Sequence, residues 1–396
     1  MRVFFINETC GRGSHGKICT DLLDMLHSQG DEGMVAYGRS DVPEAYAPYA
    51  LRVGTKIDIY LHVIGSRIFD NTGEYSKNAT KKLVQQIRKY DPDIIHLHNI
   101  HGYYIHIGVL FDFLSQCNKP VIWTLHDSWG YTGHCTCSDY IGCDRWKTGC
   151  FHCPQKKNYP ASYLFDRSKR NYQIKKKWFT SVKDLHLVTP SEWLKSEVKE
   201  SFLGCYDVTV IRSGIDLDIF RPTGSMFRQK NRLENKIILL SVANAWSQRK
   251  GLDTLRRLAL QLDESYQIVM VGGLHGESVP DRVLHIDHTK NQQELAEIYS
   301  AADVYLNLSY EETQGLTTIE ALACGTPAIV SCRTAVPESV DESCGIVVAP
   351  ERIQEIVGAI NKARLLKPED CVRHAAEYEK RKCFMRYIDL YKEIVK

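Results

Sequence analysis

Short apolar runs alternate with amphipathic stretches along the entire chain. In the first half, apolar runs that fit β-strands occupy residues 2–6, 33–37, 94–97, 121–125, 185–189 and 208–211. Stretches with the helical spacing of apolar residues occupy 18–29, 80–90, 107–117 and 191–200 between them. Because strands and helices alternate, the pattern predicts a parallel sheet covered by helices.

A second series of the same kind follows Pro222 and a polar stretch at 224–235. Its strands are predicted at 237–242, 267–271, 283–286, 304–308, 327–331 and 345–348, and its helices at 252–261, 293–301 and 317–323. The chain is therefore predicted to be an α/β protein of two Rossmann-like domains, at 1–213 and 214–379. Residues 380–396, with a last helix at about 384–395, are predicted to pack back on the first domain.

Length, charge and composition indicate a two-domain protein and argue against a nucleic-acid-binding or membrane-spanning one. A chain of 396 residues suits two domains of roughly 200 residues each. The formal net charge of +2 gives no global attraction to nucleic acid, so we expect no nucleic-acid partner. No run approaches the roughly 20 apolar residues of a spanning helix, and the first residues lack a signal-peptide core. We therefore expect a cytoplasmic protein whose 14 cysteines are thiols or metal ligands rather than disulfides.

The segment 310–327 carries the strongest functional pattern. Gly315 follows a predicted strand and permits a tight turn, and a helix is predicted to begin near Thr317. A helix start presents unpaired N–H groups and partial positive charge, which suits a diphosphate. Glu312 lies in the turn and Glu320 one turn into the helix, so one carboxylate can hold sugar hydroxyls and the other ribose hydroxyls. The alternative is that both glutamates are ordinary surface charges.

This segment resembles the two-glutamate signature of glycosyltransferase family 4, the retaining enzymes of the GT-B fold. The resemblance covers nearly the whole chain and is closest to members that act in bacterial exopolysaccharide, capsule and lipopolysaccharide assembly. It implies two Rossmann-like α/β/α domains that face each other across a cleft. It also implies that the first domain binds the acceptor and the second the nucleotide sugar.

The segment 241–251 adds two cations after another predicted strand. In the resembled family, an arginine after this strand and a lysine six positions later neutralise the diphosphate. Lys250 fits the lysine position, Asn244 occupies the arginine position, and Arg249 could restore the missing charge. Fixed cations favour catalysis because charge gathers on the leaving diphosphate in the transition state. The alternative is that Arg249 and Lys250 begin an exposed helix.

His126 stands at the end of a predicted strand, where ligands sit in open α/β sheets. By resemblance it faces the reacting sugar, and a neutral imidazole can hydrogen-bond a sugar hydroxyl. The alternative is a structural histidine that caps the loop. His96, His98, Asn99 and His101 form a similar cluster, which we rank lower, at the acceptor side or in the interdomain loop.

Residues 11–16 match the dinucleotide-binding pattern G-x-G-x-x-G, but two features argue against that function. The glycines lie too far after the strand, and the second strand lacks the acidic residue that would hold an adenosine ribose. By resemblance this is a loop over the cleft, near the donor diphosphate and the acceptor. We assign Gly13, Ser14 and Gly16 to it.

Two further patterns suggest other partners. Residues 167–179 combine basic residues with Trp178 and Phe179, which predicts a helix that attracts an anionic membrane surface, or else an ordinary solvated helix face. Residues 127–160 lack periodicity, and a long irregular loop is usually functional or clamped. Four cysteines there are candidate ligands of a structural zinc ion, the alternative being buried thiols: Cys135, Cys143, Cys150 and Cys153.

The sequence thus predicts a retaining glycosyltransferase that uses a nucleotide-diphosphate sugar, with UDP or GDP as the nucleotide. The expected acceptor is a glycan, carried on a lipid at the inner face of the membrane. His126 and Glu312 are the predicted catalytic residues, and no cofactor is expected to be required. A GT-B epimerase and a glycogen-synthase-like enzyme remain as alternatives. The predicted donor-binding residues are Asn244, Arg249, Lys250, Gln314, Gly315, Leu316, Thr317 and Glu320.

Overall fold

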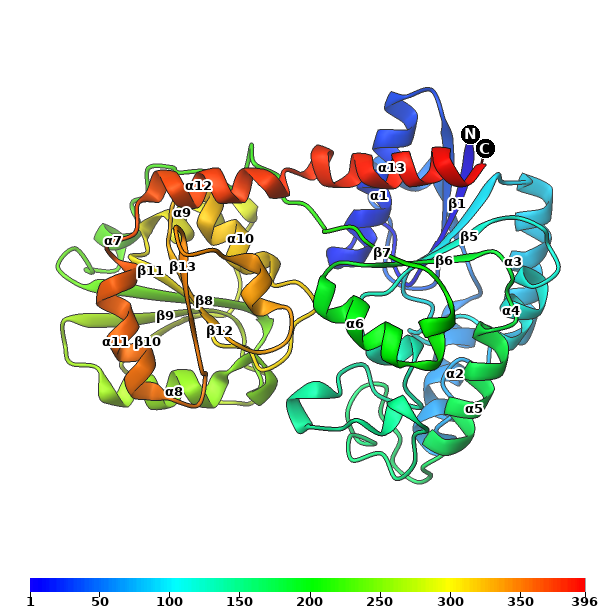
Figure 1. Ribbon diagram of the computed structural model, residues 1–396, viewed down its shortest axis with the longest axis horizontal. Helices are drawn as coiled ribbons and strands as arrows, with labels where there is room; N and C mark the ends of the chain where they lie inside the picture. The colour runs from blue at the N-terminus through cyan, green and yellow to red at the C-terminus, as the bar shows by residue number, and fades with distance from the viewer. Residues whose placement is uncertain (396) are drawn as a thin grey trace. The chain divides into compact units, whose positions relative to one another are not determined.

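The structure of the protein, a computed structural model, describes residues 1–395. Its internal contacts divide the chain into two compact units, which Figure 1 shows. The first unit holds Met1–Ile211 together with the chain from Phe384 onward, and the second holds Arg212–Cys383.

A seven-stranded parallel sheet forms the centre of the first unit, in the order β3-β2-β1-β4-β5-β6-β7. The strands are β1 (Arg2–Asn7), β2 (Glu32–Tyr37), β3 (Ala50–Arg52), β4 (Ile94–Leu97), β5 (Val121–Thr124), β6 (Leu185–Thr189) and β7 (Val208–Val210). The helices are α1 (Gly13–Ser28), α2 (Lys56–Phe69), α3 (Lys77–Tyr90), α4 (Ile107–Leu114), α5 (Ser168–Phe179), α6 (Glu192–Glu200) and the C-terminal α13 (Lys380–Val395).

The central strands of this sheet are apolar on both faces, as expected where helices cover both sides. Phe4 and Phe5 of β1 point to opposite faces, and both are fully buried. The last helix, α13, lies beside α1 (Figure 1), where Lys392 donates to the side-chain oxygen of Gln29 at 2.7 Å.

A six-stranded parallel sheet forms the centre of the second unit, in the order β10-β9-β8-β11-β12-β13. The strands are β8 (Ile237–Ala245), β9 (Tyr266–Gly273), β10 (Val283–Ile286), β11 (Val304–Asn307), β12 (Ala328–Ser331) and β13 (Gly345–Val348). The helices are α7 (Phe227–Lys230), α8 (Leu252–Gln261), α9 (Gln292–Ala301), α10 (Leu316–Ala323), α11 (Ile353–Ala363) and α12 (Pro368–Ala375).

The predicted α/β fold with two Rossmann-like parallel sheets is confirmed. Strand β3 and the helices α2, α7, α11 and α12 were not predicted. Helix α2 was missed because it lacks the usual polar outer face: Ile57, Tyr60 and Leu61 are exposed, so the helix shows no alternation of an apolar and a polar face. No helix in the described part of the chain has both the length and the apolar composition that crossing a membrane requires.

Candidate functional site

Two loops of the second unit meet at the carboxyl edge of its sheet, one after β8 and one after β11. They approach closely because Gly251 has no side chain, since a Cβ there would lie 2.4 Å from the carbonyl oxygen of Leu308. The backbone N–H of Tyr310 donates to the carbonyl of Arg249 at 2.8 Å. The guanidinium of Arg249 donates in turn to the carbonyl of Glu311 at 2.7 Å. This is the edge at which open α/β sheets bind ligands.

Lys250 and Glu312 form an ion pair where these loops meet. The hydroxyl of Ser309 donates to the same carboxylate oxygen at 3.1 Å. Burial opposes ionisation of Glu312, but the neighbouring cations of Lys250 and Arg249 hold its pKa below the usual range. Glu312 is therefore a carboxylate at neutral pH, held beside two cations.

The start of α10 lies in the same connection. Its N-cap is Gly315, at φ +81°, which places no side chain over the first N–H groups of the helix. Behind the turn, the side-chain amide of Asn307 donates to the hydroxyl of Thr318 at 2.9 Å. Leu316 and Thr317, two of the predicted donor residues, thus occupy a helix start without a side-chain cap. Such a helix start suits an anionic group such as phosphate.

The remaining predicted donor residues have different environments. Glu320 accepts a hydrogen bond from the hydroxyl of Tyr299 at 2.9 Å. The side-chain amide of Gln314 makes two bonds with the backbone of Ser213, at 2.9 and 2.8 Å, so it serves the fold here. Asn244 is exposed near the end of β8, where the strand pairing becomes irregular. Their contact with a donor stays a prediction.

Three histidines gather at the carboxyl edge of the sheet in the first unit. His98 follows β4, His126 follows β5, and His15 lies in the first turn of α1. Nδ1 of His98 and Nε2 of His126 are hydrogen-bonded at 3.0 Å, and the ring centroids of His15 and His126 are 4.4 Å apart. Burial holds the pKa of His98 and His126 well below the usual range and lowers the pKa of His15 to about 4. All three rings are therefore neutral at neutral pH.

His101 and Asp127 form a charged pair beside these neutral rings, at 2.9 Å. Burial opposes both charges, but Asp127 raises the pKa of His101 and His101 lowers the pKa of Asp127. His96 serves the fold, because its ring nitrogens bond to Thr124 at 2.8 Å and to Tyr391 of α13 at 2.6 Å.

The glycine-rich segment differs from its prediction as a loop. Gly13, Ser14 and Gly16 belong to the first turn of α1, so the loop assignment is wrong for these three residues. A Cβ on Gly16 would lie 2.5 Å from the hydroxyl of Thr9, so this glycine permits a tight connection between β1 and α1. The contact of the segment with a donor or an acceptor stays a prediction.

The basic stretch at 167–179 forms α5, but the prediction that it exposes two aromatic membrane anchors is wrong. Phe179 is fully buried against Phe111, at a centroid distance of 4.5 Å. Trp178 packs over Gly108, where a Cβ would lie 2.4 Å from the indole ring. Lys175 is only 2 % exposed and donates to the backbone carbonyls of residues 129 and 132.

Two groups of residues have donor sets suited to a metal ion. The four cysteines predicted as zinc ligands line one cavity of about 10 Å³ in the first unit. In the second unit, ligand atoms of Asp341, Cys344 and His374 lie within 4.8 Å of one another. The carboxylate of Asp341 bonds to His374 at 2.9 Å, and the Cys344 sulfur accepts the N–H of Asp341 at 3.4 Å. These atoms have protein partners, so we assign this second group no metal.

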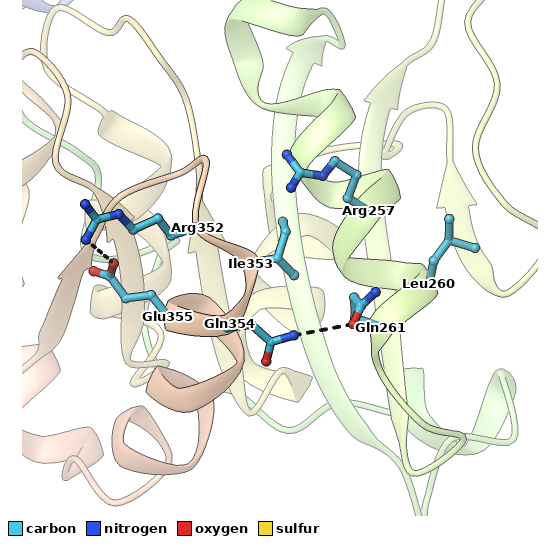
Figure 2. A pocket seen from close by; sticks show the side chains of 7 residues that line it. All are labelled: Arg257, Leu260, Gln261, Arg352, Ile353, Gln354 and Glu355. Carbon is cyan, nitrogen blue, oxygen red and sulfur yellow. Dashed lines mark hydrogen bonds and ion pairs between the residues drawn. The ribbon is translucent and has the colours of Figure 1, made fainter.

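A cavity of about 670 Å³ opens between α8 and α11 (Figure 2). Gln354 donates to Gln261 across it at 3.4 Å, and Arg352 pairs with Glu355 at 3.8 Å. It contains none of the predicted site residues and its polar side chains bond with one another, so we assign it no role.

Sequence reasoning missed two neighbours of the predicted site residues. The ring of His15 packs against that of His126 at a tilted angle, and the hydroxyl of Tyr299 donates to Glu320. Each lies far along the chain from the residue it contacts, so no local spacing could have indicated it.

Comparison with known proteins places these features in a family. The model described as Glycosyltransferase Family 4 matches residues 16–219, and the model described as Glycosyl transferases group 1 matches residues 224–382. The chain is 23% identical over 381 residues to the putative colanic acid biosynthesis glycosyl transferase WcaC of Escherichia coli K12. That alignment covers 93% of this chain and 91% of that protein.

Solved structures show the same fold. Sucrose-phosphate synthase from Thermosynechococcus elongatus is similar with a TM-score of 0.71 at 18% identity, covering 99% of this chain and 98% of that one. Anabaena Alr3699/HepE in complex with UDP-glucose is similar with a TM-score of 0.67 at 14% identity, covering 99% and 100%.

Proposed function

The chain belongs to glycosyltransferase family 4, and from that membership we propose that it is a retaining enzyme of cell-surface polysaccharide assembly. It would transfer a sugar from a nucleotide-diphosphate sugar to a glycan acceptor. The family match and the two parallel sheets establish a glycosyltransferase of the GT-B type. The name of WcaC, a colanic acid enzyme, supports the assignment to an exopolysaccharide.

The observation that carries the proposal is the junction of the Lys250 loop with the uncapped start of α10. A diphosphate bound at this helix start would meet the N–H groups of Leu316 and Thr317, which no side chain caps, with Lys250 and Arg249 beside it. Negative charge gathers on the departing diphosphate, so preorganised cations and dipoles stabilise the transition state more than the ground state. We assign Glu312, which is anchored by Lys250, to the sugar hydroxyls and Glu320 to the ribose.

UDP is the first nucleotide to test, and GDP the second. The support is the fold shared with Anabaena Alr3699/HepE, whose complex contains UDP-glucose.

We assign the acceptor to the histidine edge of the first unit. A neutral His126 can exchange hydrogen bonds with a sugar hydroxyl, but its depressed pKa makes it a weak base. The acceptor proton is therefore assigned to the departing phosphate on the same face of the sugar. This proposed chemistry requires no metal ion.

We also propose that an apolar surface on α2, rather than α5, contacts an anionic lipid surface where a lipid-linked acceptor would be found. The α2 surface consists of side chains that are 38 to 71 % exposed: Ile57, Tyr60, Leu61, Ile64, Phe69, Tyr163, Leu164 and Phe165. Its two segments are continuous, because the N–H of Tyr163 donates to the carbonyl of Arg67 at 2.7 Å and the rings of Phe69 and Phe165 stack at 5.8 Å.

Charge favours a lipid occupant for the α2 surface. Lys56 and Arg67 of α2 are exposed, and the guanidinium of Arg167 lies 5.8 Å from the Phe165 ring centroid. Each basic residue near an anionic membrane contributes about 1 kcal/mol of attraction. The variant Leu61→Glu/Leu164→Glu should therefore lose sedimentation with phosphatidylglycerol vesicles, while Leu260→Glu, an exposed leucine of α8, should keep it. Equal binding of both variants, or no wild-type binding, would refute this surface.

The experiment that tests the function is a thermal-shift screen of UDP-, GDP- and ADP-sugars followed by product analysis. A donor at 100 times its dissociation constant should stabilise the second unit by about 2.7 kcal/mol. NMR of the new linkage should show the anomeric configuration of the donor. A product of opposite configuration would refute retention. Release of an epimer, or elongation of a glucan primer alone, would instead favour the epimerase or the glycogen-synthase-like enzyme.

A further inference from the structure

The segment that follows Asp127 has almost no regular secondary structure. Between β5 and α5 it contains only three short 3-10 helices, at Ser128–Gly130, Asp139–Ile141 and Arg145–Lys147. A chain of this length without a hydrogen-bonded ladder needs another source of order. Loss of conformational freedom costs about 1–2 kcal/mol per ordered residue. The rings of Trp129, Tyr131 and Trp146 are buried in the core, but the later large apolar side chains Phe151, Leu164 and Phe165 are exposed and offset little of this cost.

Four cysteines of this segment converge on one place. The 10 Å³ cavity that they line is about the size of one water molecule. The Cys135 thiol donates a hydrogen bond to the Cys153 sulfur, and Cys143 and Cys150 line the same walls. We propose that the segment binds one structural Zn²⁺ ion through the thiolates of Cys135, Cys143, Cys150 and Cys153.

Backbone N–H groups already point at two of these sulfurs. The N–H of Gly133 donates to Sγ of Cys150 at 3.1 Å, and the N–H of Gln155 donates to the Cys153 sulfur. Gly133 is needed for this approach, because a Cβ there would lie 2.1 Å from the carbonyl of Ser168. Two fixed N–H groups therefore point at the place where the sulfurs converge.

The surroundings also supply positive charge. Four thiolates around Zn²⁺ carry a net charge of −2, which is costly to bury without compensation. The buried amino group of Lys175 donates to two carbonyls, lies 3.4 Å from the centroid of the Trp129 ring and forms no ion pair with a carboxylate of the described residues. His134 lines the cavity, is held by Asp70 at 2.5 Å through Nδ1, and leaves a buried Nε2 without a hydrogen-bond partner in the described chain. Both groups therefore suit an anionic centre.

The cysteines must draw together to bind the ion. A Zn–S distance of about 2.3 Å places tetrahedral sulfurs about 3.8 Å apart. Within residues 1–395, no three of these sulfurs lie within 4.8 Å of one another. The Cys150–Cys153 turn can close by rotation of side chains, because Arg145 holds its backbone through the carbonyls of Phe151 and His152.

Metal analysis of the full chain, purified without chelator, tests the proposal. We expect about one zinc per chain, lost in Cys150→Ser and in Cys153→Ser. The matched control is Cys137→Ser, a cysteine of the same segment that does not line the cavity, and it should keep the metal. Loss of zinc should expose residues 133–165 to protease while UDP binding by the second unit is unchanged. This last comparison separates the zinc proposal from the proposed function.

Should the serine variants fail to fold, zinc release from the wild-type chain by a mercurial provides the measurement. About four thiols titrated per zinc released supports the proposal. Folded, protease-resistant protein without zinc overturns it, and so does a Cys135–Cys153 disulfide in the purified chain. Retention of stoichiometric zinc by Cys150→Ser would overturn this ligand set.

Discussion

Replacing Lys250 with methionine should weaken binding of UDP by one to two orders of magnitude. Methionine keeps an unbranched apolar stem, so the turn before α8 is preserved while the ammonium is lost. The Lys250 side chain is about one-fifth exposed and contacts Glu312 in the free protein. A charge-assisted hydrogen bond contributes about 1.5–3 kcal/mol, and about 1.4 kcal/mol is a factor of ten in affinity. The expected loss is therefore roughly 10- to 150-fold.

The same substitution leaves Glu312 without its ion-pair partner. Its carboxylate would then face the diphosphate with only Arg249 left beside it, and two like charges 4 Å apart repel by about 4 kcal/mol at an effective dielectric constant of 20. Uptake of a proton by Glu312 relieves part of this repulsion. The double variant Lys250→Met/Glu312→Gln should therefore bind UDP more tightly than Lys250→Met alone, although it lacks both charged groups.

Isothermal titration calorimetry with UDP at fixed ionic strength measures both effects. The matched control is Arg256→Met on α8, whose guanidinium pairs with Asp253 and Glu277 away from the two loops. It should bind UDP as the wild type does. Wild-type affinity in Lys250→Met would refute the diphosphate site. A double variant that binds no better than Lys250→Met would refute the role given to the Lys250–Glu312 pair.

Three other results are expected. Glu320→Gln should weaken UDP binding about tenfold by calorimetry, and Tyr299→Phe should weaken it less; the reverse order would contradict the ribose assignment. Phe179→Ala should destabilise the fold by about 3–5 kcal/mol in denaturant because the ring is fully buried, whereas exposed Tyr163→Ala should change little; a loss below 1 kcal/mol would contradict this. Lowering the pH from 7 to 5 should reduce the free energy of opening of β4 and β5, measured by hydrogen exchange corrected for the intrinsic exchange rate, because the folded pKa of His98 and His126 is depressed and stability is lost as the pH falls below about 6.5. Each such histidine makes the free energy of unfolding fall by up to about 1.4 kcal/mol per pH unit. The explanation would be contradicted if His98→Asn showed the same dependence of stability on pH as the wild type.

The two loops at the carboxyl edge of the second sheet could be predicted because their signals are local. An apolar run, a glycine and a helical pattern follow one another within about 20 residues around Gly315, and the structure builds β11, the turn and α10 from them. The ion pair of Lys250 and Glu312 was not predicted. It depends on Gly251, which lets the two loops touch although Lys250 and Glu312 are 62 residues apart in sequence.

The histidine edge of the first unit shows where local reasoning ends. His126 was ranked first because it ends a strand, yet its neutral state follows from burial and from the nearby rings of His15 and His98. The contact of His15 with His126 depends on the order of the strands, since β1, β4 and β5 are successive neighbours in the sheet. The spacing of residues along the chain does not reveal the order of the strands in the sheet, so this contact could not be predicted from it.

The incorrect prediction of solvent exposure along α5 has a cause that applies to the whole irregular segment at 127–160. The basic residues of 167–179, Lys175 among them, were predicted to form a solvent-facing helix, but an irregular backbone packed against α5 presents carbonyls to Lys175 that no ladder satisfies. Buried carbonyls without donors are costly, so the nearest cation on the neighbouring helix turns inward to meet them. Asp70 does the same for N–H groups, accepting from the backbone of Arg167 at 2.6 Å. In this irregular segment, charged side chains are buried because they satisfy backbone groups. A pattern of polar and apolar residues therefore predicts them to be exposed when they are in fact buried.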